Sequence, residues 1–166
     1  MLTVTGSGKT LISALLLRHH LEIEVEARAT GNAKKVAFFL VEKVALCVQQ
    51  HAVLDCNLGE HPVAKFTGNT TGLVKNKAYW DKQFSENMVV VCTAQILLEC
   101  LNSGFITMSQ INLLIFDEAH HAKGAHPYAR VMKSHYFAHR GERPRILSMT
   151  ASPVDSKTRD VKATAL

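Results

Sequence analysis

The sequence predicts an α/β fold in which helices cover both faces of a mostly parallel β-sheet. Apolar runs typical of buried strands alternate with stretches of helical periodicity, the pattern of parallel strands joined by crossover helices. A glycine-rich loop at residues 5–10 precedes the first helical stretch, and one apolar run ends in two carboxylates. Open sheets of this class bind ligands at the carboxyl ends of their strands, so we expect both features at one edge.

The first strand is expected to be short. Only Met1 to Val4 precede the glycine loop, whereas such a loop normally follows a strand of about 5 or 6 residues. We assign residues 1–154 to one domain with a truncated first strand, and 155–166 to a tail or the start of a linker. Further strands are expected at 36–41, 63–66, 88–92, 113–116 and 146–149, and helices at 10–27, 43–54, 75–84, 93–102 and 125–136.

The period of the first helix predicts which of its apolar residues point inward. They are Leu11, Ala14, Leu15, Leu21 and Val25, and the apolar stem of Arg18 falls on the same face.

The composition is that of a globular domain, with 47% hydrophobic and 20% charged residues. The net charge of +5 is compatible with a polyanionic partner, but such a charge on its own usually means only a solvated basic surface. No stretch reaches the roughly 20 apolar residues that cross a bilayer, and the N-terminus lacks signal-peptide features. We therefore expect no membrane partner and an intracellular protein, cytoplasmic or nuclear. The four cysteines form no Cys-x-x-Cys pair and are expected to be reduced and buried.

The glycine loop has the features of a phosphate-binding loop. Gly6 and Gly8 allow backbone angles that let successive amides point at phosphate oxygens, and the helix that follows adds its positive end. Lys9 would reach the β and γ phosphates, and Thr10 would offer its hydroxyl to Mg²⁺. The general pattern has a glycine where Thr3 stands, so a plain turn before an amphipathic helix is the alternative. The candidate cofactor-binding residues are Thr5, Gly6, Ser7, Gly8, Lys9 and Thr10.

The acidic strand end would complete that site. Asp117 is expected to hold Mg²⁺ together with Thr10, directly or through a water. Glu118 can orient the attacking water and take its proton. The alternative is that the strand ends in solvent and its acid caps the next helix. The glycine loop and the acidic strand end would then occur in the same chain by chance.

Two histidines follow the acids. Zinc binding by His120 and His121 with Asp117 and His126 is one interpretation, but adjacent side chains point in different directions and zinc ligands usually lie a turn apart. We favour a coupling role for His120 beside the γ phosphate and a packing or capping role for His121. The candidate catalytic residues are Lys9, Asp117, Glu118 and His120.

Together with Thr150-Ala151-Ser152-Pro153, these strings make residues 2–156 resemble the first motor lobe of superfamily 2 helicases, especially that of fungal Dicer-like ribonucleases. The resemblance implies a RecA-like P-loop fold, ATP and Mg²⁺ as cofactors, and RNA, double-stranded by expectation, as a partner. Further matching strings are Phe38-Phe39-Leu40-Val41 followed by Gln49-Gln50, Val91-Cys92-Thr93-Ala94-Gln95-Ile96-Leu97 and His126-Pro127-Tyr128-Ala129.

The resemblance also implies roles by position. Thr150, Ala151 and Ser152 fall in the segment that couples hydrolysis to RNA movement in this family. Contacts of such lobes with the nucleic-acid backbone, which give grip without reading sequence, are implied at Val41, Lys43, Gly68, Thr93 and Gln95.

We expect the chain to be a fragment that works with other domains of a parent protein. In the family, a second RecA-like lobe supplies arginines to the ATP site, and an arginine finger is worth roughly 10³ to 10⁵ in rate. A Dicer-like parent in RNA silencing would also carry ribonuclease domains, and the isolated chain would be inactive. The alternatives are a non-catalytic nucleotide-binding remnant, or the lobe of another superfamily 2 helicase, such as an antiviral RNA sensor or a DNA repair helicase.

Overall fold

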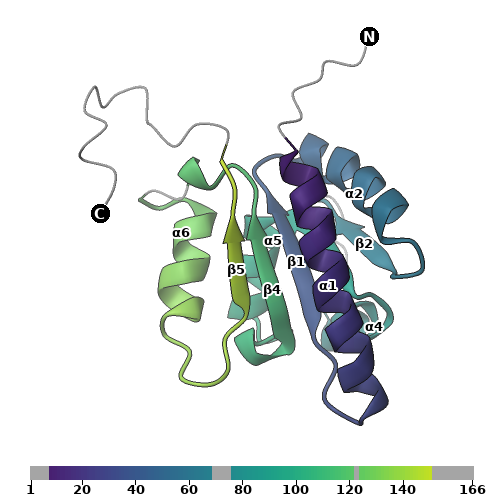
Figure 1. The fold of residues 1–166 in the computed structure, drawn as a ribbon. Helices are drawn as coiled ribbons and strands as arrows, with labels where there is room; N and C mark the ends of the chain where they lie inside the picture. The colour runs from purple at the N-terminus through teal and green to yellow at the C-terminus, as the bar shows by residue number, and fades with distance from the viewer. Residues whose placement is uncertain (1–7, 69–75, 122–123, 151–166) are drawn as a thin grey trace.

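A computed structural model describes residues 8–68, 76–121 and 124–150 of the chain. Its centre is one five-stranded parallel sheet with the strand order β2-β3-β1-β4-β5 (Figure 1). The strands are β1 (Val36–Val41), β2 (Val63–Phe66), β3 (Val89–Thr93), β4 (Ile111–Phe116) and β5 (Arg145–Ser148).

Helices cover both faces of the sheet, as expected (Figure 1). One face packs against α1 (Lys9–Ala29) and α2 (Val44–Leu58). The other packs against α4 (Lys77–Glu86), α5 (Ala94–Asn102) and α6 (Pro127–Val131). The short helices are the 3₁₀ turns η1 (Met108–Gln110) and η2 (Ala119–His121) and the π-helical turn η3 (Met132–Tyr136). The α/β prediction and its element order are therefore confirmed over the described residues.

The central strand β1 shows why a continuous apolar run is required here. All six of its residues are buried, because helices lie on both sides. Phe38 and Leu40 pack on the α4–α5–α6 side, whereas Phe39 and Val41 pack on the α1–α2 side. The sheet thus separates two apolar cores.

The predicted inward face of the first helix is wrong for three residues. Ala14 and Leu21 are buried, but Leu11, Leu15 and Val25 are 57%, 58% and 45% exposed. The helix is rotated from the orientation that the apolar period predicts.

Polar partners explain this rotation. The hydroxyl of Ser13, which is fully buried, donates to Sδ of Met149 at 2.9 Å. Oε1 of Glu24, also buried, accepts hydrogen bonds from Nε of Arg28 at 2.8 Å and from the amide of Lys35 at 2.7 Å. Since these contacts satisfy inward polar groups, three apolar side chains are left at the surface.

Two further expectations are corrected. The helix expected at 125–136 is α6 followed by the wider π-helical turn η3. The cysteines are free, and Cys47, Cys92 and Cys100 are buried as expected, but Cys56 is exposed. Within the described residues, no helix combines the length and apolar character needed to cross a membrane.

Candidate functional site

The amino end of α1 lies at the carboxyl edge of the sheet (Figure 1). Gly8 immediately precedes this helix and has a φ of +65°, a left-handed backbone that glycine adopts without strain. The amide of Ile12 donates to the carbonyl of Gly8, so the helix is continuous from its first turn. Its first amides and its dipole favour an anion at this end. Of the predicted loop, Gly8, Lys9 and Thr10 are described, whereas Thr5, Gly6 and Ser7 lie outside the described residues.

The two acids follow β4 directly. The amide of Asp117 donates to the carbonyl of Leu40, which continues the pairing of β4 with β1 by one residue. The backbone turns sharply at Glu118, whose φ of +52° is the single positive value among the described non-glycine residues. Such a conformation costs of the order of 1–3 kcal/mol, and residues that adopt it cluster at active sites and ligand clamps. The amide of Glu118 donates back to Oδ1 of Asp117 at 3.1 Å.

The predicted lysine and the second acid meet across the sheet edge. Nζ of Lys9 lies 2.9 Å from Oε1 of Glu118, although the two residues are 109 positions apart. Both side chains are mostly buried, with 23% and 26% of their surfaces exposed. The structure therefore brings Lys9, which follows the described end of the glycine loop, into contact with the acidic strand end.

The electrostatics of this site favour a bound cation. Asp117 is 8% exposed. Its burial, and secondly the neighbouring charge of Glu118, raise the pKa of its carboxyl, whereas Lys9 and the amide of Glu118 oppose the shift. Two adjacent carboxylates offer the oxygen ligands that Mg²⁺ prefers, and a divalent cation would relieve their mutual repulsion. The donor set thus fits the predicted metal.

A third segment joins the site from the end of β5. Nδ1 of His120 lies 2.9 Å from Oγ1 of Thr150 and 3.3 Å from Oε2 of Glu118. The amide of Ala119 donates to the carbonyl of Met149 at 2.7 Å, which fixes the two segments against each other. The predicted residues Ala151 and Ser152 lie outside the described residues.

Tyr128, to which the sequence assigns no role, holds the acidic segment through hydrogen bonds from its hydroxyl. Its side chain is fully buried, and its hydroxyl donates to the carbonyls of Asp117 at 2.8 Å and Leu40 at 3.1 Å. Its ring packs edge-on against Phe116. Burial, and secondly the charge of Asp117, raise the pKa of this phenol, so it acts as a hydrogen-bond donor. The string His126-Pro127-Tyr128-Ala129 was its only signal in the sequence.

The residues expected to touch nucleic acid lie at or just after the carboxyl ends of β1, β2 and β3. Val41 and Thr93 are the paired last residues of β1 and β3. Val41 is 1% exposed, so the whole residue, backbone included, is covered by the rest of the chain. Lys43 caps α2, Gly68 follows β2, and Gln95 lies in the first turn of α5, where its amide nitrogen donates to Glu99 at 3.0 Å. Lys43, Gly68 and Gln95 are exposed.

Comparison with known proteins supports a helicase lobe. The family model of DEAD/DEAH box helicases matches residues 1–161. Dicer-like protein 1 of Cryphonectria parasitica is 54% identical over 165 residues, which cover 98% of this chain and 10% of the relative. Dicer-like protein 1 of Phaeosphaeria nodorum is 56% identical over 156 residues, covering 92% of this chain and 10% of the relative.

A solved structure agrees with the fold. The helicase domain of Pyrococcus furiosus Hef is 29% identical, with a TM-score of 0.66 over 92% of this chain and 29% of that chain. Of the two Dicer-like relatives, by contrast, the chain spans only about a tenth of the length. The resemblance stated from the sequence is confirmed, and so is the RecA-like fold class. This chain belongs to the DEAD/DEAH box helicase family.

Proposed function

We propose that this chain is the ATP-binding first motor lobe of an RNA helicase or double-stranded RNA translocase in a Dicer-like ribonuclease of RNA silencing. The observation that carries the proposal is the 2.9 Å contact between Nζ of Lys9 and Oε1 of Glu118. It joins a helix amino end suited to phosphate with an acid suited to water activation. The similarity to Dicer-like proteins supports the RNA substrate.

In this proposal, residues 5–10 cradle the phosphates, and Lys9 leaves Glu118 to reach the β and γ phosphates of ATP. The hydroxyl of Thr10 and the carboxylate of Asp117 hold Mg²⁺. When bound, this ion supplies charge neutralisation at the phosphates. Glu118 then orients the attacking water and accepts its proton. The raised pKa of Asp117 supports the need for a cation beside it.

His120 and Thr150 link this chemistry to movement. Because the imidazole contacts both the hydroxyl of Thr150 and the carboxylate of Glu118, a change at the phosphates can reach the segment after β5. In the proposal, Ala151 and Ser152 continue this coupling segment. Val41, Lys43, Gly68, Thr93 and Gln95 contact the RNA backbone, with double-stranded RNA as the expected form.

Nucleotide binding is the first test, and the 166-residue chain can be used for it. Lys9→Ala should weaken binding of a fluorescent ATP analogue with Mg²⁺ by tenfold or more. Lys77→Ala is the matched control, because Lys77 is exposed and pairs with Asp81 on α4. Equal affinities of the wild type and the Lys9 variant would refute the site.

Turnover is the second test and requires the parent protein. Glu118→Gln should retain nucleotide binding and abolish RNA-stimulated ATPase, whereas Glu86→Gln, at the end of α4, should change neither. A second lobe would supply the arginines that complete the site, so we expect little ATPase from the isolated chain. Binding without turnover by both the chain and the parent would favour the alternative of a non-catalytic nucleotide-binding remnant.

A further inference from the structure

The hydroxyl of Tyr128 lies between the ends of two neighbouring strands. Its oxygen is 2.8 Å from the carbonyl oxygen of Asp117, which follows β4, and 3.1 Å from that of Leu40, the penultimate residue of β1. A tyrosine hydroxyl carries one proton, so the two carbonyls share one donor. The carbonyl of Leu40 also accepts from the amide of Asp117 at 2.9 Å. The hydroxyl therefore adds a second connection between two strand ends that a sheet hydrogen bond already joins.

The ring that carries this hydroxyl is held in place from several sides. Tyr128 is fully buried in α6, where its amide donates to Nδ1 of His126 at 3.3 Å. The ring centroids of these two residues lie 4.9 Å apart. The ring of Tyr128 also meets that of Phe116, the last residue of β4, edge-on with the centroids 5.2 Å apart. Because the phenol is fixed in this way, a displacement of either strand end changes its hydrogen bonds to both.

The peptide group between Asp117 and Glu118 is the part of the site that this hydroxyl holds. Its C=O accepts from Tyr128, and its N–H donates to Oδ1 of Asp117 at 3.1 Å. A tilt of this peptide group would therefore move the carboxylate that is expected to hold Mg²⁺. The same peptide group precedes the positive φ of Glu118, a conformation that persists only where the surrounding contacts maintain it.

The other strand end leads into a segment expected to contact RNA. Glu42 and Lys43 directly follow β1, and Lys43 is exposed at the amino end of α2. The charge of Glu42 contributes, after burial and the charge of Asp117, to the raised pKa of Tyr128, so Glu42 lies within electrostatic reach of the phenol. One side chain from α6 thus connects the two segments to which RNA and Mg²⁺ are assigned.

We propose that Tyr128 is a positioning residue that couples RNA contact at the end of β1 to the placement of Asp117, so that bound RNA strengthens the binding of ATP with Mg²⁺. This coupling rests on the proposed function. Tyr128 is fully buried and acts through the two carbonyls rather than by contact with either ligand. Coupling between two binding sites is reciprocal, so the nucleotide should strengthen RNA binding by the same factor.

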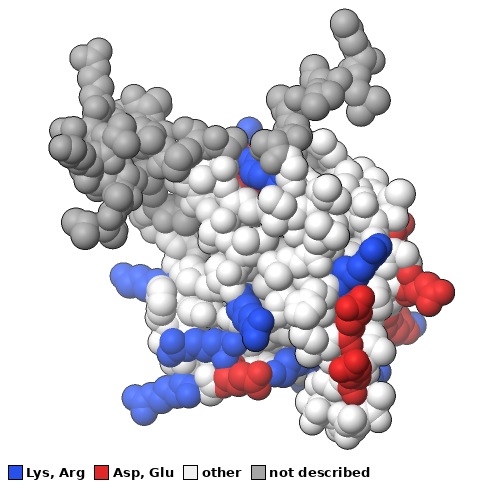
Figure 2. Space-filling view, in the orientation of Figure 1, with Lys and Arg blue, Asp and Glu red and all other residues white. Residues whose placement is uncertain are grey.

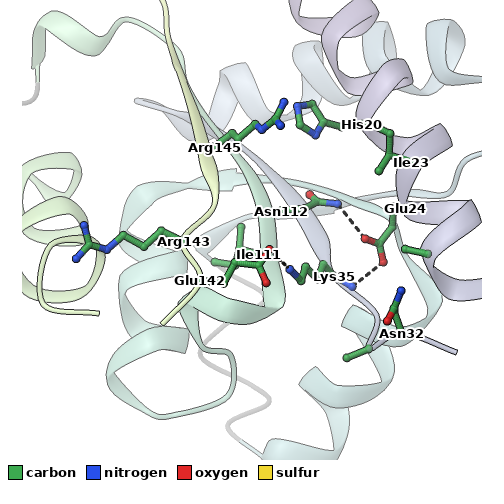
Figure 3. Close-up of a pocket in the computed structure, with 12 residues that line it drawn as sticks. His20, Ile23, Glu24, Asn32, Lys35, Ile111, Asn112, Glu142, Arg143 and Arg145 are labelled. Carbon is green, nitrogen blue, oxygen red and sulfur yellow. Dashed lines mark hydrogen bonds and ion pairs between the residues drawn. The ribbon is translucent and has the colours of Figure 1, made fainter. Parts of the chain in front are cut away.

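The opposite end of the sheet offers a matched control. A hollow of about 560 Å³ lies there between α1, the start of β4 and the start of β5 (Figure 3). Glu24, which lines it, is buried and accepts a hydrogen bond from the amide of Lys35 at 2.7 Å (Figure 3). Glu24→Gln therefore weakens a buried polar contact at this end, as Tyr128→Phe does beside the acids. Charged side chains of this face also gather toward the amino ends of the strands (Figure 2), and RNA attracted by them alone would affect both variants alike.

Nucleotide affinity with and without RNA tests the proposal in the parent protein. The probe is a fluorescent, non-hydrolysable ATP analogue with Mg²⁺, and the RNA is a synthetic duplex at saturating concentration. In the wild type, RNA should tighten binding of the analogue by about fivefold or more, as is usual for coupled sites. Without RNA, Tyr128→Phe should bind the analogue within about twofold of the wild type, and RNA should then tighten its binding by less than about twofold. Glu24→Gln should keep the full effect of RNA, although its urea midpoint also falls.

Three results would overturn the proposal. They are a wild-type affinity that RNA does not change, an RNA effect that Tyr128→Phe retains, and an RNA effect that Glu24→Gln loses to the same extent. The last result would mean that the coupling depends on overall stability and not on the hydroxyl of Tyr128. If Lys9→Ala loses nucleotide binding while Tyr128→Phe keeps the RNA effect, the proposed ATP site stands and only the coupling role of Tyr128 fails.

Discussion

Nδ1 of His120 lies 2.9 Å from the hydroxyl of Thr150, so the end of β5 is joined to the acidic segment at the end of β4. The same imidazole nitrogen lies 3.3 Å from Oε2 of Glu118. Because the imidazole of His120 contacts both Glu118 and Thr150, we expect a movement of either residue to displace the other.

Thr150→Val should uncouple the two segments. It keeps the size of the side chain and removes the hydroxyl, so we expect nucleotide affinity within about twofold of the wild type. RNA stimulation of ATPase in the parent protein should fall about tenfold, equivalent to about 1.4 kcal/mol. Steady-state ATPase with and without RNA measures this change. Thr150→Ser, which keeps the hydroxyl, should retain the stimulation, and a loss equal to that of the valine variant would contradict the prediction.

Tyr128→Phe should lower the free energy of unfolding by about 1–2 kcal/mol, because a buried carbonyl at Asp117 loses its donor. The carbonyl of Leu40 keeps the hydrogen bond from the amide of Asp117. Urea denaturation measures the loss. Tyr79→Phe, in a half-buried ring on α4, is the control and should cost less. Identical unfolding curves for wild type and Tyr128→Phe would show that the phenol does not support the acidic turn.

The placement of the acids at the sheet edge could be predicted from the sequence. The carboxyl ends of parallel strands lie at one edge of the sheet, whatever the details of packing. The apolar run before Asp117 and the glycines before Lys9 were sufficient for this. That topology predicts that Lys9 and Glu118 lie at one edge, and the structure adds their 2.9 Å contact. The role of Tyr128 does not follow from the topology, because nothing in its sequence neighbourhood specifies two carbonyl partners from other segments.

The orientation of α1 could not be predicted for a related reason. Its apolar residues lie nearly all round the helix, so periodicity does not separate the face of Leu11 and Leu15 from the buried face of Ala14, Leu17 and Leu21. The partners of Ser13 and Glu24 on other segments accompany the second choice. Single-sequence periodicity weighs apolar positions and cannot include such polar contacts. The same limit applies after Val131, where a helical pattern does not distinguish an α-helix from the wider turn of η3.

The cysteines should differ sharply in reactivity. Cys56 is exposed on α2, whereas the other three are buried. Burial raises the pKa of Cys47 and Cys92, and raises that of Cys100 to about 12. Since the thiolate is the reactive form, these three stay protonated and protected at pH 8. Titration with a coloured disulfide reagent should detect one fast thiol in the native chain and four after unfolding. Cys56→Ser should abolish the fast phase, and a remaining fast thiol would contradict the assigned burial.

Phe84→Ala should remove a large part of the stability of the core on the α4–α5–α6 face. Its ring stacks on that of Trp80, with the ring centroids 5.5 Å apart. It also meets the ring of Phe38 edge-on, with the centroids 5.9 Å apart. Truncating a buried phenylalanine costs about 3–5 kcal/mol, against about 5–15 kcal/mol for the total stability of a typical domain.

The single tryptophan, Trp80, is 3% exposed and gives a direct readout of this core. Its emission should shift to longer wavelength on unfolding, and the urea midpoint should fall strongly in Phe84→Ala. Phe137→Ala is the matched control, because Phe137 is 64% exposed and a surface substitution usually changes stability by less than about 0.5 kcal/mol. Equal midpoints for the two variants would mean that the packing of Phe84 against Trp80 contributes no more to folding than an exposed ring.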